Sequence, residues 1–132
     1  MSRSIPAIIA VTVVSVAAAA AAAAPVPKLL SCSGTALLRP TGTVVLSCAD
    51  ANTELSRTHW LSWGGSRAVG RTDFGVNLCT PTCVASSMRF FPNSTVRLLD
   101  ARPTSRGLLF SRAVITYSLN GAKKTFTAYP AT

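Results

Sequence analysis

The sequence predicts an all-β domain, a small disulfide-stabilised β-sandwich, with a small β-barrel as the alternative. Short stretches in which apolar and polar residues alternate recur along the chain, and Gly, Pro, Asn and Asp separate them. No segment sustains the period of an amphipathic helix. The 132 residues suffice for one domain. Four cysteines provide the cross-links that a domain of this size often needs.

The expected strands follow one another with short gaps. The first is typical of a half-buried strand, because Val44, Leu46 and Cys48 alternate with Thr43, Val45 and Ser47. By the same criterion, further strands are expected at residues 58–63, 67–77, 95–99 and 107–119.

Three irregularities are expected within this series. Gly70 and Gly75 weaken the strand that contains them. In the last strand the apolar face changes side near residues 111–112, which predicts a bulge. One helical turn is expected at residues 50–57, with Asp50 as its cap.

The pair Asn120-Gly121 is the clearest local signal in the sequence. Both residues tolerate positive φ, which a two-residue type I′ turn requires. A turn there sets the register of a hairpin: Leu119 faces Ala122, Tyr117 faces Lys124, and Ile115 faces Phe126. The last of these pairs is expected in the core.

Residues 1–24 are predicted to be a cleavable signal peptide, so that the mature domain spans residues 25–132. Arg3 precedes an uncharged stretch from Ile5 to Ala24 that ends in small residues. A membrane anchor is one alternative, since an apolar run of about 20 residues can span a bilayer. A second is lipidation at residues 29–32, but Lys28 interrupts the apolar run. After cleavage we expect no transmembrane helix.

All four cysteines belong to the predicted mature domain. An even number of cysteines in an exported chain indicates a disulfide framework. Three pairings are possible, and we favour the one that joins neighbours along the chain, Cys32–Cys48 with Cys79–Cys83. Zinc is disfavoured because the chain has only one histidine, His59, and we expect no metal and no cofactor.

The cysteines and the residues around them resemble a known group of sequences. The segments that carry the resemblance are Cys32-Ser33-Gly34, residues 45–52, residues 60–65 and residues 77–83. Together they are similar to small secreted actinobacterial proteins of uncharacterised function. The most specific parts are Cys48-Ala49-Asp50-Ala51-Asn52 and Cys79-Thr80-Pro81-Thr82-Cys83. The resemblance implies export and four cysteines, and it brings no catalytic residue.

Enzymatic chemistry has few candidate residues in this chain. His59 could serve as a general base, but no Gly-x-Ser-x-Gly element accompanies it. Asp50, Asn52 and Glu54 alternate like the start of a calcium loop, yet the Gly expected next is replaced by Leu55. An Asx turn is the simpler interpretation. We therefore expect a protein that is not an enzyme.

The excess of basic residues is the most suggestive feature for function. The net charge is +9, and the removal of Arg3 with the leader lowers it to +8. After Asp100 the chain contains no acidic residue. Trp60 and Trp63 have opposite orientations in a regular strand, so one could lie at the surface. The candidate binding residues are thus Trp60, Trp63, Arg102, Arg106, Arg112, Lys123 and Lys124.

The predicted function is non-catalytic binding or structural support at the cell envelope or outside the cell. An anionic envelope polymer or lipid headgroups are the expected partners of the cationic surface. No nucleic acid is expected, because export removes most of it from reach. The alternative is a secreted effector or inhibitor that engages a protein through loops near residues 60–67 or 77–87. A small hydrolase is the third hypothesis.

Overall fold

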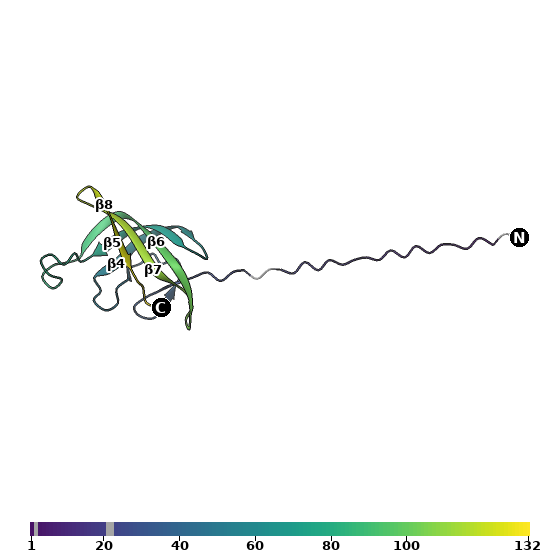
Figure 1. Cartoon of the computed structure of the whole chain (residues 1–132), viewed down its shortest axis with the longest axis horizontal. Helices are drawn as coiled ribbons and strands as arrows, with labels where there is room; N and C mark the ends of the chain where they lie inside the picture. The colour runs from purple at the N-terminus through teal and green to yellow at the C-terminus, as the bar shows by residue number, and fades with distance from the viewer. Residues whose placement is uncertain (2, 21–22) are drawn as a thin grey trace.

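The computed structural model describes residues 1, 3–20 and 23–132, and it is all-β (Figure 1). The described part of the leader is exposed and extends away from the domain (Figure 1). The strands are β1 (Leu29–Leu30), β2 (Ala36–Leu37), β3 (Val44–Val45), β4 (Thr53–Trp63), β5 (Ala68–Val76), β6 (Arg89–Thr104), β7 (Gly107–Leu119) and β8 (Ala122–Ala128). The predicted all-β, disulfide-stabilised class is therefore confirmed.

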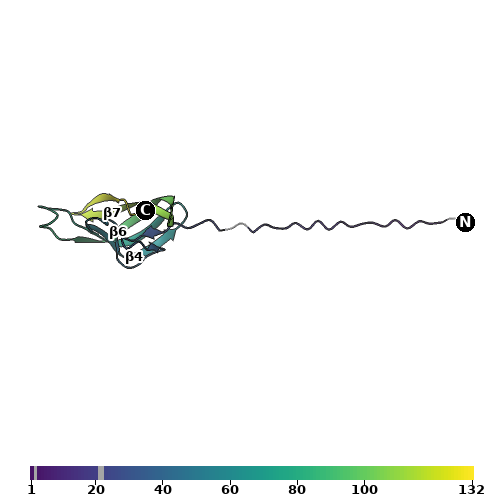
Figure 2. The ribbon, with the colours of Figure 1, turned by 90° about the horizontal axis from the view of Figure 1, so that it is seen from below.

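Six of these strands form one antiparallel sheet in the order β3-β4-β5-β6-β7-β8. Each strand pairs with its neighbour in the sequence, and the sheet curls into a half-barrel (Figures 1 and 2). This arrangement is closer to the barrel alternative than to two stacked sheets. A meander of long strands curls because every strand pair adds a right-handed twist.

The short strands β1 and β2 extend the sheet at one end of β7. The Lys28 amide donates to Leu108 O at 2.9 Å, and the Phe110 amide donates to Lys28 O at 3.0 Å. This bridge uses the edge of β7 that β8 leaves unpaired, since β8 covers β7 only from Ala113 to Leu119. Strand β2 then lies beside β1.

Two disulfides connect the cysteines in the pairing that we favoured. Cys32–Cys48 joins the turn after β1 to the turn after β3, with 5.3 Å between the Cα atoms. Because β1 is attached to β7 and β3 is the opposite edge strand, this bond ties the two sides of the half-barrel together. Cys79–Cys83 closes a small loop between β5 and β6.

The core fills the concave side of the half-barrel. Its largest fully buried side chains include Phe74, Phe110, Leu55, Leu98 and Ile115, which come from four different strands. Leu29 of β1 joins the same cluster, so the small extension helps to cover the open side.

The expected hairpin is confirmed, whereas one helical turn and the bounds of three strands, β3, β4 and β6, are corrected. All three predicted pairs around Asn120-Gly121 are present. The helical turn at residues 50–57 is wrong, because β4 already begins at Thr53. Strand β3 is shorter than the predicted 43–48, since the chain turns back at residues 47–52 to start β4. Strand β6 is much longer than 95–99 because it pairs along its length with both β5 and β7.

Candidate functional site

The two tryptophans pack against the core of the molecule. Trp63 is 8% exposed and its Nε1 donates to Pro27 O at 2.8 Å. Trp60 is half-buried and its Nε1 donates to Pro40 O at 2.9 Å. A register shift between Trp60 and Ser62 turns both indoles to the same side, where the ring centroids are 4.7 Å apart. The expected opposite orientation is therefore wrong, and the indoles support the core rather than offer a surface platform.

The five predicted cationic residues do not form one cluster. Lys123 and Lys124 lie beside the β7–β8 turn, whereas Arg102 and Arg106 lie at the opposite end of β7. Arg106 Nη1 donates to Gly34 O at 2.8 Å. Arg112 forms an ion pair with Asp100 at 2.7 Å, so it is neutralised locally. Arg102, Lys123 and Lys124 are exposed.

Two arginines and a histidine lie close together on the convex face of the sheet. Arg71 is opposite Thr95, and Arg97 is opposite Val69, so the two arginines are diagonal neighbours on β5 and β6. His59 of β4 is opposite Arg71, and all three side chains are exposed. Among the described residues, the ion pairs are Arg57–Asp73 and Arg112–Asp100, and neither involves Arg71 or Arg97. We call Arg71, Arg97 and His59 the convex cluster.

Sequence reasoning missed the convex cluster for a physical reason. Alternation with the buried residues Gly70, Val96 and Leu98 indicates that Arg71 and Arg97 face outward. Their proximity depends on the register between β5 and β6, and the long, irregular connection between these strands leaves that register open.

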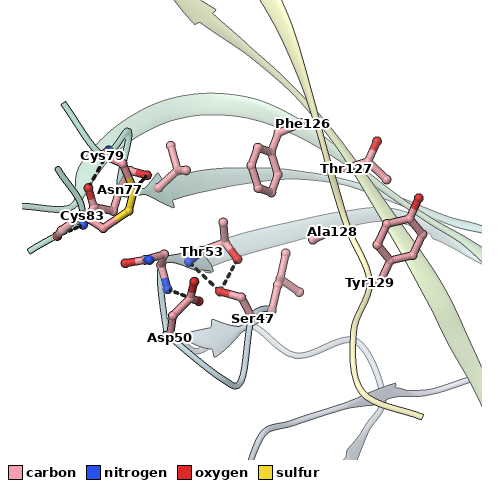
Figure 3. A pocket seen from close by; sticks show the side chains of 13 residues that line it. Ser47, Asp50, Thr53, Asn77, Cys79, Cys83, Phe126, Thr127, Ala128 and Tyr129 are labelled. Atoms are coloured by element: carbon pink, nitrogen blue, oxygen red, sulfur yellow. Dashed lines mark hydrogen bonds between the residues drawn. A yellow bond between two sulfur atoms is a disulfide. The ribbon is translucent and has the colours of Figure 1, made fainter. Parts of the chain in front are cut away.

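A hollow lies on the seam between the two edges of the half-barrel. It has a volume of about 410 Å³. One wall is the end of β8 with Tyr129, and the other is the turn before β4 (Figure 3). Leu46, Val76 and Ala128 are buried and form its apolar floor. We call this hollow the seam pocket, and its volume is in the range of small-ligand sites.

Hydrogen bonds hold much of the polar rim of the seam pocket in place. Ser47 Oγ accepts from the amide of Thr53 at 3.1 Å and hydrogen-bonds its hydroxyl at 2.8 Å (Figure 3). The Asn77 side chain accepts from the Cys79 amide at 2.9 Å and donates to Cys83 O at 2.8 Å. The disulfide loop is thereby held against the pocket. Tyr129, at 73% exposure, is left at the rim.

Asp50 is the charged residue of the seam pocket. The amide of Asn52 donates to Asp50 Oδ1 at 3.2 Å, which is the Asx turn expected for this segment. That hydrogen bond, followed by one from Ser47, lowers the pKa of the Asp50 carboxyl. The carboxylate is therefore charged at neutral pH and can accept a hydrogen bond from a ligand.

These arrangements separate His59 from the polar groups of the seam pocket. His59 lies on the convex face next to Arg71, whereas the seam pocket is lined by Asp50 and hydroxyl groups. A triad needs its histidine in contact with a serine and an acid, and His59 does not line the seam pocket, where Ser47 and Asp50 lie. Glu54, the third residue of the motif Asp50-x-Asn52-x-Glu54, lies in β4. Its side chain packs over Gly75 of the neighbouring strand.

The remaining findings concern the environment of the chain. The two disulfides indicate folding in an oxidising compartment. In the part of the chain that the structure describes, no helix is long and apolar enough to cross a membrane. No protein-family model, no curated protein and no solved structure matches this chain.

Proposed function

We propose that the chain is an exported, non-catalytic binding protein that attaches to phosphate-bearing polymers or lipid headgroups of the cell envelope through its cationic surface. Cleavage after the alanine run places the mature N-terminus near Pro25 and leaves a net charge of +8. A net charge of this size attracts anionic surfaces over several ångströms.

The observation that carries the proposal is the convex cluster. Two arginines on adjacent strands point away from the core, and neither has a carboxylate partner among the described residues. Guanidinium groups bind phosphate oxygens with paired hydrogen bonds, so two of them on one face suit a repeating anion. The other exposed cations, including Lys123, Lys124 and Arg102, add a diffuse field around this face.

The test compares two double variants that change the net charge equally. Arg71→Glu with Arg97→Glu reverses the convex cluster, and Arg102→Glu with Arg106→Glu reverses two cations at the end of the sheet. Each cation near an anionic surface contributes about 1 kcal/mol, so we expect the first variant to lose more than about tenfold in affinity. The control is expected to lose about threefold or less. Binding is measured to phosphatidylglycerol vesicles and, separately, to polyphosphate, which distinguishes lipid from polymer.

Salt provides the second arm of the test. Raising the ionic strength from about 0.1 M to about 1 M shortens the Debye length from about 10 Å to about 3 Å and should abolish binding of the unmodified protein. Equal losses in the two double variants would show that the convex cluster is not a site. Binding that persists at high salt would show that the charge is incidental.

A further inference from the structure

The outer edge of β8 carries backbone groups without partners. The turn at Asn120-Gly121 joins Leu119 to Ala122, so alternate residues of β8 from Ala122 to Ala128 exchange hydrogen bonds with β7. The amides of Lys123, Thr125 and Thr127 must then point away from β7, and we call them the outward amides. Strand β8 is the last strand of the sheet, and no backbone hydrogen bond of the described residues involves them.

Farther along the edge of β7 that pairs with β8, the protein already has one more strand on the outside. Strand β1 shares the edge of β7 with β8, and β2 pairs with β1 on its far side. A strand added beside β8 would therefore be in line with β2, one strand farther from β7. Along β8 itself this position is unpaired and borders the seam pocket, which Phe126, Thr127, Ala128 and Tyr129 line from that side (Figure 3).

The seam pocket matches the side-chain spacing of an added strand. Alternate side chains of a strand point to opposite faces of the sheet, so every second side chain of an added segment would point to the concave side. There the side chain would meet the apolar floor of the pocket, formed by Leu46, Val76 and Ala128. The backbone of the segment would pair with the outward amides, as in other peptides that extend a sheet edge.

Charge selects the occupant. Strand β8 contains Lys123 and Lys124 and no acidic residue, and both lysines lie exposed at the start of the free edge. The carboxylate of the seam pocket, Asp50, lies on the wall opposite β8 (Figure 3). A second copy of the chain would bring another cationic surface to the same edge and would be repelled. We propose that the free edge of β8 binds an extended, acidic segment of a partner protein as an additional strand, with one of its apolar side chains in the seam pocket.

The decisive variant removes one outward amide without changing charge. Thr125→Pro deletes the N–H that points away from β7 and places the proline ring in the path of an added strand, a position that an edge strand tolerates. Thr125→Val is the matched control because it keeps the N–H and the shape of threonine. The probe is a synthetic peptide of alternating Glu and Val with 7 residues, the length of β8. A peptide of alternating Lys and Val tests the charge preference.

The readouts are affinity and residue-resolved hydrogen exchange by NMR. We expect the acidic peptide to bind the unmodified protein and Thr125→Val alike, and Thr125→Pro at least about tenfold more weakly, since a hydrogen bond is lost and the path is blocked. Binding should slow exchange of the outward amides, whereas the amides paired with β7 are protected before and after. Retained protection of those paired amides in Thr125→Pro shows that β8 is intact.

Three results would overturn the proposal. The first is equal affinity of Thr125→Pro and Thr125→Val for the acidic peptide. The second is no protection of the outward amides at peptide concentrations up to about 1 mM. The third is protection of the outward amides in the protein alone, together with concentration-dependent dimers in analytical ultracentrifugation, which would identify a second copy as the occupant.

Discussion

At the residue scale, Gly70 and Gly75 explain how aromatic rings pack on the sheet. A Cβ atom at Gly70 would lie 2.9 Å from Trp60 Cε3 and 3.0 Å from His59 O. A Cβ atom at Gly75 would lie 2.8 Å from a ring carbon of Phe90. The two glycines were expected to weaken this strand, and in the structure their missing side chains make room for neighbouring rings and backbone.

Gly70→Ala is therefore expected to destabilise the protein by about 1–3 kcal/mol, because backbone atoms of β4 cannot move away cheaply. Gly65→Ala is the control, since a Cβ atom there meets nothing within 4 Å, and it should change stability by about 0.5 kcal/mol or less. Urea unfolding of both variants measures the difference. Equal stability of the two variants would show that Trp60 can shift to accept the methyl group.

At the element scale, strands β6 and β7 change their buried face without a bulge. Leu98 and Ala113 are paired and buried. Three residues away on each strand, Ala101 and Phe110 are paired, with Phe110 buried and Ala101 partly buried against the core. The register of the pair is continuous across this step. The predicted change of face is therefore present, but the predicted extra residue is not.

A positive φ at Asp100 accompanies this change of face. Asp100 has φ of 54°, its carbonyl accepts from Ser111 Oγ at 2.7 Å, and its carboxylate pairs with Arg112. Aspartate tolerates this left-handed conformation better than most residues because its short side chain can hydrogen-bond locally.

Asp100→Ala is expected to destabilise the protein by about 1–2 kcal/mol, which is the usual penalty for a left-handed residue with a Cβ atom and no local hydrogen bond. Asp100→Asn keeps the tolerance for positive φ and loses only a half-exposed ion pair, so its effect should be below about 1 kcal/mol. Thermal unfolding of the two variants checks this order. The reverse order would assign the stabilisation to the Arg112 ion pair instead of the backbone.

At the scale of the whole molecule, the two disulfides differ in what they connect. Cys32–Cys48 links segments attached to opposite edges of the half-barrel across a sequence separation of 16 residues. Cys79–Cys83 spans only 4 residues and restrains a loop that Asn77 already holds by hydrogen bonds. The first bond therefore lowers the conformational entropy of the unfolded chain and keeps the two sides of the sheet together. The second bond restrains only its own loop.

Replacing Cys32 and Cys48 by serine is expected to lower the free energy of unfolding by about 2–5 kcal/mol. The matched double replacement of Cys79 and Cys83 should lower it by clearly less, because a short loop restricts the unfolded chain less. Guanidinium unfolding of both variants, with free-thiol analysis of the parent protein, measures this. A larger loss from the Cys79–Cys83 variant would mean that the loop, not the tie across the half-barrel, limits stability.

Much of the fold followed from local signals in the sequence. Asn120-Gly121 sets the register of its hairpin because only a few residue pairs adopt the required turn. The favoured cysteine pairing joined neighbours in the chain, and the structure has this pairing. The all-β class, the boundaries of β7 and the Asx turn at Asp50 are likewise determined by short stretches of chain.

The tertiary structure alone decided the binding surfaces. Arg71 meets Arg97 only through the register of β5 and β6, and the seam pocket joins Asp50 to Tyr129, which are far apart in the sequence. The orientation of Trp60 depended on an irregularity in the pairing of β4 with β5. Alternation along a strand predicts on which face of the sheet a side chain lies. The neighbours of that side chain depend on pairing with distant strands and on the curvature of the whole sheet.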